Sequence, residues 1–461
     1  MPLIDPSDPR PVHFMGAAGA GMSALAELLV RRGARVTGCD ANPAGAPDLA
    51  HLGVPVAAGH DPSHVQGARA LVVTSAVRPS HPEVEAARAL GIPVIRRAEA
   101  LAQAVTSEHG QLIAIAGTHG KTTTSVMTTE ALASAGLDPT GVVGGRVPAW
   151  GGNLRFGGDS VFVVEADEYD RSFLALAPTV AVVTNLEADH LDIYADLADI
   201  REAFATFVRG AKTVVLCADD PGADALDVPP GAAVVRYGIS APNANLTVRD
   251  LRLAADGSSF TVVAQGRTLG EVVLRVPGRH NVLNALAALA SGLTVGATVP
   301  AMAPGLRAFG GVERRFQRLG EAGGVTVVDD YAHHPTEIRA TLAAARNAFP
   351  GRRLVAAFQP HLYTRTRDFA ADFGAALAGA DAIFLTDIYP AREQPIPGVS
   401  ANLIADAARA AGGALTWYGT RADLAAALAD NVGVGDVVLT LGAGDITRTG
   451  RELLDKLAAA A

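Results

Sequence analysis

The chain has 461 residues, of which 49% are hydrophobic and 18% are charged, and its formal net charge is −9. This composition is typical of a well-packed globular protein; it excludes a disordered chain and argues against a general nucleic-acid-binding role. The start lacks a basic segment followed by an apolar stretch, and no run approaches about 18 apolar residues, so we expect a cytoplasmic protein without membrane insertion. The two cysteines, Cys39 and Cys217, end apolar runs and are expected to be buried free thiols.

The length predicts about three domains, since domains average roughly 150 residues. The first unit alternates apolar strands with helices, a pattern typical of a parallel sheet. Its predicted strands lie at 12–15, 35–40 and 70–75, and its predicted helices lie at 23–33 and 81–91.

A glycine-rich loop, "GAAGAGMS", joins the first strand to the first helix. Gly16, Gly19 and Gly21 in this loop, with Asp40 at the end of the next strand, are similar to a dinucleotide-binding fingerprint. The spacing is G-x-x-G-x-G, however, and not the usual G-x-G-x-x-G. The loop therefore indicates either a site for a nucleotide diphosphate or a structural turn, and it is weak support for a nicotinamide cofactor.

A second unit begins near residue 105 and a third near residue 315. The second unit has predicted strands at 112–117, 160–167, 179–185 and 213–217, and predicted helices at 123–136 and 280–292. Between residues 231 and 276, short strands with turn signals predict a small antiparallel insertion or edge. In the third unit, alanine-rich helices alternate with predicted strands at 325–330, 353–358, 382–387 and 436–442.

The stretch "GTHGKTTT" lies between a predicted strand and a predicted helix of the second unit. The chain has three lysines against thirty-five arginines, and one of them, Lys121, lies here. Gly117 and Gly120 let backbone N–H groups turn inward, and the helix N-terminus adds partial positive charge. With Thr122 as a hydroxyl for Mg²⁺, this order predicts a phosphate-binding loop. The spacing departs from G-x-x-x-x-G-K-[ST], and a glycine turn with a solvated lysine is the alternative.

Acidic side chains follow two predicted strands of the second unit, in "EADEYDRSF" and "TNLEADHLD". Ligands bind at the carboxyl ends of strands in open α/β sheets, so we expect both clusters at adjacent strand ends beside the phosphate loop. Oxygen is the ligand atom that Mg²⁺ prefers, so the clusters predict a Mg²⁺ site, and His190 alone is expected to form hydrogen bonds. A solvated acidic rim or helix caps are the alternative. The clusters contain Glu165, Asp167, Glu168, Asp170, Glu187, Asp189, His190 and Asp192.

Several longer motifs together resemble the Mur ligase family, from about residue 12 to about residue 450. They are "GAAGAGMSALAE", "GTHGKTTT", "EADEYDRSF", "TNLEADHLDIY", "GRHNVLNA", "VDDYAHHPTE" and "FQPHLYTRTRDF". The resemblance implies an α/β fold of three domains, in which two Rossmann-like domains flank a central P-loop ATPase domain with a mostly parallel sheet. It implies a UDP-sugar-binding domain at 1–105, an ATP-binding domain at 106–315, and a domain at 316–461 for ATP closure and amino-acid binding.

The motifs are most similar to those of family members that join L-alanine to the lactyl carboxylate of UDP-N-acetylmuramate. That resemblance implies an ATP-dependent ligase with Mg²⁺ and an acyl-phosphate intermediate, acting in peptidoglycan precursor synthesis. Members that attach a murein tripeptide to the same sugar nucleotide share the ATP motifs and are the alternative. An oxidoreductase would leave Lys121 without a role, and a regulator would bind ATP without releasing phosphate. We expect a monomer or homodimer with no nucleic-acid partner.

By this resemblance, Lys121, Glu165 and His190 are expected to be catalytic, and Thr122, Glu165 and His190 to hold the metal. Several relatives bridge two metals with a carbamylated lysine. No lysine lies between Lys121 and Lys212, so that group is absent from this stretch.

The resemblance also implies three sets of binding residues. ATP is expected at Gly117, Thr118, His119, Gly120, Lys121, Thr122, Thr123, Asn284, Arg315, Asp330 and His333. The UDP-sugar is expected at Gly16, Gly19, Gly21, Asp40 and Ser75. The carboxylate of L-alanine suits Arg365, because a guanidinium group binds carboxylates through paired hydrogen bonds, and His361 lies nearby in sequence. Some family members have arginine where Leu362 stands, so we expect this chain to lack one contact to the amino acid.

Overall fold

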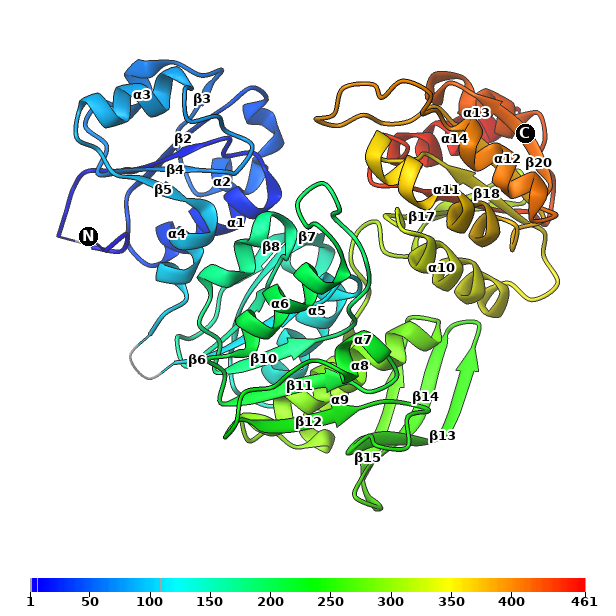
Figure 1. Ribbon diagram of the computed structural model, residues 1–461, viewed down its shortest axis with the longest axis horizontal. Helices are drawn as coiled ribbons and strands as arrows, with labels where there is room; N and C mark the ends of the chain where they lie inside the picture. The colour runs from blue at the N-terminus through cyan, green and yellow to red at the C-terminus, as the bar shows by residue number, and fades with distance from the viewer. Residues whose placement is uncertain (1, 6, 108–109, 461) are drawn as a thin grey trace.

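The computed structural model describes residues 2–5, 7–107 and 110–460, which form three α/β units, each built around its own sheet. Figure 1 shows the first unit (blue) and the third unit (yellow to red) on opposite sides of the central unit (cyan to green). The predicted fold class, α/β with three domains and mostly parallel sheets, is confirmed.

The first unit is a five-stranded parallel sheet with the order β3-β2-β1-β4-β5. The order in which strands are added to the sheet reverses between β1 and β4, and this switch point is where open α/β sheets bind ligands. The strands are β1 (Val12–Met15), β2 (Val36–Asp40), β3 (Val56–Ala58), β4 (Ala70–Val73) and β5 (Val94–Arg96). The helices are α1 (Ala20–Arg31), α2 (Pro47–His51), α3 (Pro82–Ala89) and α4 (Arg97–Ala104), with the 3₁₀ turns η1 (Pro43–Gly45) and η2 (Pro62–Val65).

The central unit is a ten-stranded sheet with the order β15-β14-β13-β12-β11-β10-β6-β9-β7-β8. Its middle strands are parallel: β6 (Gln111–Ala116), β7 (Thr140–Val147), β9 (Val161–Glu165), β10 (Val180–Val183), β11 (Thr213–Cys217) and β12 (Ala233–Tyr237). Antiparallel pairs stand at the edges, formed by β8 (Gly152–Arg155) and by β13 (Leu246–Ala254), β14 (Gly257–Ala264) and β15 (Arg267–Leu274). The predicted antiparallel edge between 231 and 276 is therefore present. The helical segments are α5 (Lys121–Ser134), η3 (Pro148–Trp150), η4 (Tyr169–Ala175), α6 (Leu197–Val208), α7 (Pro221–Asp224), α8 (Arg279–Thr294) and α9 (Val299–Ala308).

The third unit is a six-stranded sheet with the order β16-β17-β21-β18-β19-β20, in which only β16 is antiparallel. Its strands are β16 (Gln317–Ala322), β17 (Val325–Asp330), β18 (Leu354–Phe358), β19 (Ala382–Thr386), β20 (Leu415–Gly419) and β21 (Val437–Leu441). Its helices are α10 (Pro335–Ala348), α11 (Tyr363–Leu377), α12 (Asn402–Ala410), α13 (Arg421–Ala429) and α14 (Thr447–Ala460). The predicted boundaries near 105 and 315 fall between the sheets.

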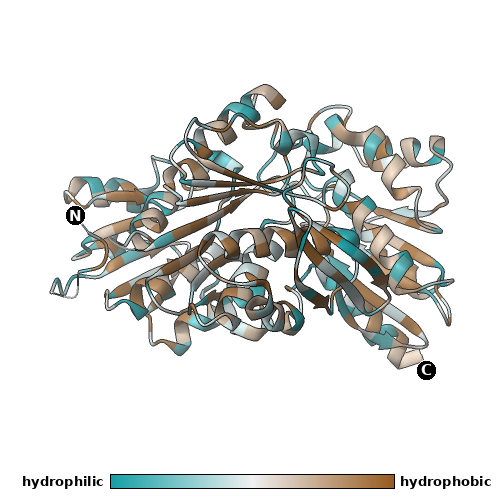
Figure 2. Ribbon diagram, turned by 90° about the horizontal axis from the view of Figure 1, so that it is seen from below, coloured by the Kyte–Doolittle hydropathy of each residue, from teal (hydrophilic) through white to brown (hydrophobic). Residues whose placement is uncertain are grey.

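The first two units share one continuous apolar core, because α1 packs against β7 and β8 as well as against its own sheet. The third unit has separate apolar clusters on the two faces of its sheet. Figure 2 shows the strands as predominantly hydrophobic, as expected for strands that helices cover on both faces. Polar contacts also join the third unit to the central one, among them Arg365 to Asp189 and Thr336 to Glu187.

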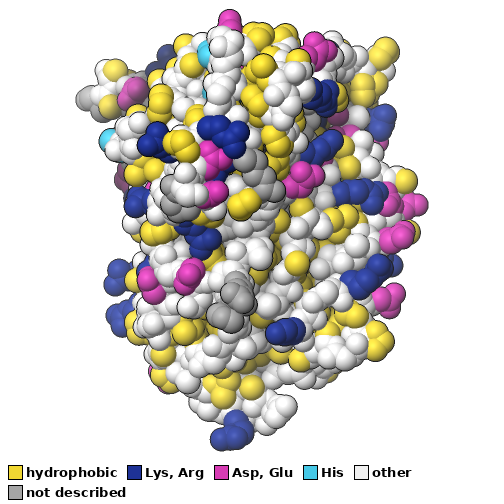
Figure 3. All heavy atoms as spheres, turned by 90° about the vertical axis from the view of Figure 1, so that its left-hand side faces the viewer, with side chains coloured by type: hydrophobic (Ala, Val, Ile, Leu, Met, Phe, Trp, Pro, Cys, Tyr) yellow, Lys and Arg dark blue, Asp and Glu magenta, His cyan; other side chains and the backbone are white. Residues whose placement is uncertain are grey.

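Charged side chains of both signs are scattered over the face of the molecule that Figure 3 presents, with small apolar patches between them. Within the described ranges, every helix is too short or too polar to cross a bilayer.

Candidate functional site

The loop after β6 brings backbone N–H groups and Lys121 to the start of α5. Gly117 and Gly120 both have positive φ, 137° and 80°. A Cβ atom at Gly117 would lie 2.1 Å from Thr184 Oγ1, and one at Gly120 would lie 2.7 Å from Asn284 Oδ1. Only glycine fits at these two positions, and the resulting curve leaves the N-terminus of α5 free to receive an anion.

The ammonium group of Lys121 lies over this loop. Its Nζ donates to the carbonyl of Gly117 at 2.7 Å and to that of Thr118 at 3.3 Å, and it lies 2.7 Å from Glu168 Oε2. Burial acts to lower the pKa of Lys121, but Glu168 and the neighbouring carboxylates outweigh it and raise that pKa. Lys121 is thus a fully charged donor held at the rim of the loop.

Glu168 is the carboxylate that faces Lys121. Burial raises its pKa to about 7, although Lys121 favours the ionised form. The hydroxyl of Tyr194 donates to the backbone carbonyl of Glu168 at 2.6 Å, which fixes the segment after β9. The site therefore holds one ammonium group against one weakly acidic carboxyl group, and a phosphate group would compete with that carboxyl group for Lys121.

Glu165 and Thr122 form the oxygen-rich part of the site. Thr122 Oγ1 donates to Glu165 Oε1 at 2.8 Å, and the N–H of Gly144 donates to Glu165 Oε2 at 2.6 Å. The Nε2 atom of His190 lies 3.7 Å from Glu168 Oε1, and its buried Nδ1 has no hydrogen-bond partner in the described part of the chain. A hydroxyl, a carboxylate and an unpartnered imidazole nitrogen beside a phosphate loop fit a divalent cation.

The two acidic clusters do not follow adjacent strands, so that part of the sequence prediction is wrong. They follow β9 and β10, and β6 lies between these two strands in the sheet. The reason is topological: β6 comes first in the chain, and β9 and β10 then pair with it on opposite sides. As a result, one acidic cluster lies on each side of the loop that follows β6, whereas the prediction placed both clusters on the same side.

A cavity of about 960 Å³ opens between the central and third units on one side of the phosphate loop. Asn284 and Asp330 line it, as do His119, Gly120, Thr123 and Arg315. Asn284 accepts from Thr124 Oγ1 at 3.2 Å, and its amide nitrogen donates to Asn281 Oδ1 at 3.3 Å. Asp330 accepts from the N–H groups of Phe316 and Ala332 at 2.7 and 2.8 Å, and burial raises its pKa to about 6. The volume is ample for a nucleoside.

A second cavity of about 340 Å³ is lined by the phosphate loop and Lys121. The central unit contributes Thr118, Lys121, Thr122, Glu165 and His190 to its lining, and the third unit contributes His333, His361, Leu362 and Arg365. His119, Gly120 and Arg315 line both cavities. A molecule bound across the loop would therefore have one end in each cavity.

Arg365 is occupied by a contact that sequence analysis did not anticipate. Its Nε and Nη2 donate to Asp189 Oδ1 at 3.1 and 2.5 Å, and both side chains are buried. Burial acts to raise the pKa of Asp189, but the guanidinium group holds it well below its usual range. This ion pair joins α11 of the third unit to the loop after β10. His361 lines the same cavity, and burial lowers its pKa to about 3, so its imidazole is neutral.

Glu337 is a functional candidate that sequence analysis missed. It lies near three basic groups: its carboxylate is 3.3 Å from His119 Nδ1, 3.1 Å from His333 Nδ1 and 3.5 Å from Arg315 Nη1. Burial acts to raise its pKa, but His333 and His119 hold it well below its usual value. Its place in the first turn of α10, within "VDDYAHHPTE", was the available signal. Arg315 also lies over the ring of Tyr331, 5.0 Å from its centroid.

Arg392 is a second residue that sequence analysis missed. It lines the smaller cavity, lies 4.5 Å from the ring centroid of Tyr169, and its Nη2 donates to Asp192 at 2.9 Å. It belongs to an irregular loop after β19, and no local pattern marks it.

In the first unit, the predicted residues gather at the switch point between β1 and β4. Gly16 has φ of 77°, Gly19 precedes α1, and Asp40 Oδ2 accepts from the N–H of Ala18 at 2.9 Å. Asp40 therefore holds the shape of the glycine loop. Ser75 is exposed just after β4. Gly21 lies close to Arg97, since a Cβ at Gly21 would be 3.0 Å from the Arg97 side chain. These residues lie outside the lining of the two cavities described above.

Family comparison gives three matches in chain order. Residues 11–109 match the Mur ligase family, catalytic domain; 115–292 match the Mur ligase middle domain; and 314–444 match the Mur ligase, glutamate ligase domain. The UDP-N-acetylmuramate–L-alanine ligase of Laribacter hongkongensis is 48% identical over 95% of this chain and 96% of its own.

Two solved structures resemble the whole chain. The UDP-N-acetylmuramate-alanine ligase of Thermotoga maritima has a TM-score of 0.82 and 29% identity, covering 98% of this chain and 100% of its own. A murein peptide ligase of Psychrobacter arcticus has a TM-score of 0.71 and 26% identity, covering 97% and 99%.

Proposed function

Because this chain belongs to the Mur ligase family, which uses ATP, we propose that it joins L-alanine to UDP-N-acetylmuramate in peptidoglycan precursor synthesis. The 48% identity to a ligase of that name, over 95% of this chain, supports this assignment. The observation that carries the chemistry is the position of Lys121, which lines the smaller cavity and follows Gly120, a residue that lines both this cavity and the nucleoside-sized one.

The reaction activates a carboxylate. An oxygen of the lactyl carboxylate attacks the γ-phosphorus of ATP, the bond to the β,γ-bridging oxygen breaks, and ADP leaves. The amine of L-alanine then attacks the acyl phosphate, loses a proton, and displaces inorganic phosphate to leave an amide. Lys121 would leave Glu168 and donate to the oxygens of the transferring phosphoryl group, where negative charge gathers.

Mg²⁺ belongs to this proposal. Thr122, Glu165 and His190 would hold it, since all three line the smaller cavity together with Lys121. When bound, the ion neutralises charge on the transferring phosphoryl group. The hydrogen bond from Gly144 orients the Glu165 carboxylate for that role.

The nucleotide subsites follow from the larger cavity. We assign the adenine to the region of Asn284 and the ribose to Asp330, whose carboxylate is already aimed by two backbone N–H groups. The phosphates would pass over the loop at 117–123, between the imidazole groups of His119 and His333 and the guanidinium group of Arg315.

The amino-acid subsite is assigned to the smaller cavity. Arg365 uses Nε and Nη2 for Asp189, so Nη1 is the group available to the carboxylate of L-alanine, and His361 stands beside it. The UDP-sugar is assigned to the switch point of the first unit, at Gly16, Gly19, Gly21, Asp40 and Ser75. This division gives 1–105 the sugar nucleotide, 106–315 the ATP and 316–461 the amino acid. We expect the reaction in the cytoplasm, with the protein as a monomer or homodimer.

A ligase that attaches a murein tripeptide is the second candidate, favoured by the likeness to the Psychrobacter arcticus enzyme. Phosphate release from ATP distinguishes the two, with UDP-N-acetylmuramate in every tube and either L-alanine or the tripeptide as the amine. We expect release with L-alanine. Release with the tripeptide but not with L-alanine would overturn the substrate assignment. Release with neither amine would overturn the proposal that the chain is a ligase.

A further inference from the structure

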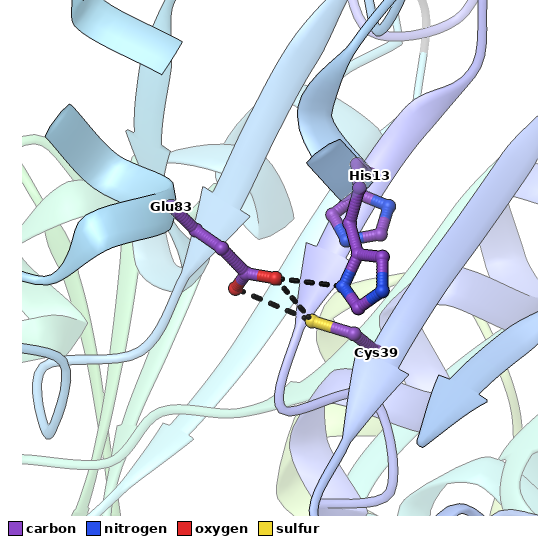
Figure 4. Close-up of side chains that lie close together, drawn as sticks. His13, Cys39 and Glu83 are labelled. Atoms are coloured by element: carbon purple, nitrogen blue, oxygen red, sulfur yellow. Dashed lines mark hydrogen bonds and ion pairs between the residues drawn. The ribbon is translucent and has the colours of Figure 1, made fainter. Parts of the chain in front are cut away.

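A compact group of metal-ligating side chains lies in the first unit, away from the site described above. One ligand atom from each of His13, Cys39, His64 and Glu83 lies within 4.8 Å of the other three. The group comes from four separate elements: β1, β2, η2 and the first turn of α3. Figure 4 shows the side chains of Cys39 and Glu83 pointing toward each other, with His13 beside them.

Three of the four donor residues are buried, and all four are close enough to share an ion. Cys39 Sγ lies 3.3 Å from Glu83 Oε1, and His64 Nδ1 lies 2.9 Å from the same oxygen. Neighbouring ligands of a tetrahedral zinc ion lie about 3.3–3.8 Å apart, given metal–ligand bonds of about 2.0–2.3 Å. His13, Cys39 and Glu83 are each at most 2% exposed, so small shifts of the side chains would close the site around an ion.

His13 is prepared for coordination by its neighbour. Its Nδ1 lies 2.9 Å from Thr37 Oγ1, whereas its buried Nε2 has no hydrogen-bond partner among the described residues. A proton on Nδ1, bonded to Thr37, leaves the lone pair of Nε2 for a metal, which is the usual arrangement of a histidine ligand and its supporting group.

A deprotonated group of these four side chains would carry negative charge with few basic side chains near it. Among the described residues, the basic partners within 4.0 Å of the Glu83 carboxylate are His60 and His64, and no lysine or arginine is among them. Apolar side chains surround the group, including Met15, Val65 and Val84. A thiolate and a carboxylate together would carry a charge of −2, which a divalent ion would balance.

We propose that His13, Cys39, His64 and Glu83 form a structural Zn²⁺ site that ties together β1, β2, η2 and α3. One thiolate, two imidazoles and one carboxylate are a ligand set that suits Zn²⁺, and four protein ligands leave no open position for catalysis. His60 borders the group: its side chain is 30% exposed and its Nδ1 lies 3.3 Å from Cys39 Sγ.

The site lies directly beneath the glycine loop of the first unit. The carbonyl of Cys39 accepts from the N–H groups of Gly16 and Ala17 at 2.8 and 3.1 Å, and Asp40 accepts from Ala18. An ion on the side chain of Cys39 would therefore hold the backbone that shapes this loop, whatever ligand the loop binds.

The test uses the full chain stripped of metal with a chelator and then titrated with Zn²⁺ in excess Mg²⁺. The chain has a matched control, because Cys217 is also buried but lies in β11 of the central unit. We expect the native chain and Cys217→Ser to retain one equivalent of zinc through gel filtration. Cys39→Ser and His13→Gln should bind it about 100-fold or more weakly. With Co²⁺ in place of zinc, the native chain should show a thiolate-to-metal charge-transfer band that Cys39→Ser lacks.

Thermal unfolding gives a second measurement on the same samples. Zinc should raise the unfolding temperature of the native chain and of Cys217→Ser, but not that of Cys39→Ser or His13→Gln. Circular dichroism of the metal-free variants shows whether each is folded, and either folded variant suffices for the comparison. Failure of the native chain to bind zinc, or equal binding by the native chain and the folded variants, would overturn the proposal.

Discussion

Replacement of Lys121 by methionine tests the central claim about phosphate chemistry. Methionine keeps most of the side-chain volume and removes the ammonium group, which now donates to Gly117, Thr118 and Glu168. Loss of one preorganised charged donor to a transition state costs about 3–4 kcal/mol. Each 1.36 kcal/mol is a factor of ten in rate, so we expect phosphate release to fall by about 10²–10³-fold or more.

The same change should destabilise the folded chain, because Glu168 loses its ionic partner while it stays buried. Breaking a buried ion pair from one side costs about 3–5 kcal/mol. Burial already raises the pKa of Glu168 to about 7, so this carboxyl group can take up a proton, and the loss of stability should be smaller at pH 6 than at pH 8. The double variant Lys121→Met with Glu168→Gln removes both charges and should recover most of the stability without recovering the rate.

Three measurements separate these effects: phosphate release with UDP-N-acetylmuramate and L-alanine, unfolding in urea, and calorimetric binding of the sugar nucleotide. Lys212→Met is the matched control, since Lys212 is exposed, and it should change none of them. We expect sugar-nucleotide binding to survive in Lys121→Met. A folded variant that keeps a tenth or more of the native rate would refute the role of the ammonium group, and loss of sugar-nucleotide binding would refute the division between units.

Three further predictions concern the loop, a buried histidine and the contact between units. Gly120→Ala would place a Cβ 2.7 Å from Asn284 Oδ1, at a residue whose φ is 80°. Because the loop would have to shift, the KM for ATP should rise about tenfold or more. An unchanged KM would count against the loop as the phosphate site. His334→Asn keeps a cap on α10 but removes an imidazole whose pKa burial lowers to about 3, whereas an unfolded histidine titrates near 6.5. Between pH 7 and pH 4.5 the native chain should therefore lose about 2–3 kcal/mol of stability that the variant keeps, as urea unfolding at those two pH values would measure; equal losses would contradict it. Asp189→Asn leaves Arg365 buried without its anion, so kcat/KM for L-alanine should fall about 10²-fold. Amide hydrogen exchange at the start of α11 should also rise. Unchanged exchange would show that this ion pair does not hold the two units together.

Much of the fold was predictable because local patterns determine local structure. The apolar runs at 112–117, 160–167 and 179–185 became β6, β9 and β10, and the glycines before Lys121 mark the turn from strand to helix. The antiparallel edge was also visible, since turn signals within 231–276 separate short strands. These features depend on residues close together in the sequence, whose backbone preferences and periodicity can be read directly.

The sequence by itself therefore determined the α/β class and the turn of glycines before Lys121, and it predicted the residue types that a phosphoryl-transferring ligase needs. The tertiary structure decided which distant residues are in contact. It placed β6 between β9 and β10, Asp189 against Arg365, and Cys39 beside Glu83. Such pairs join residues 44 and 176 positions apart, for which no periodicity exists. They arise only when sheet order and packing bring distant segments together, and burial then fixes which charges must be paired.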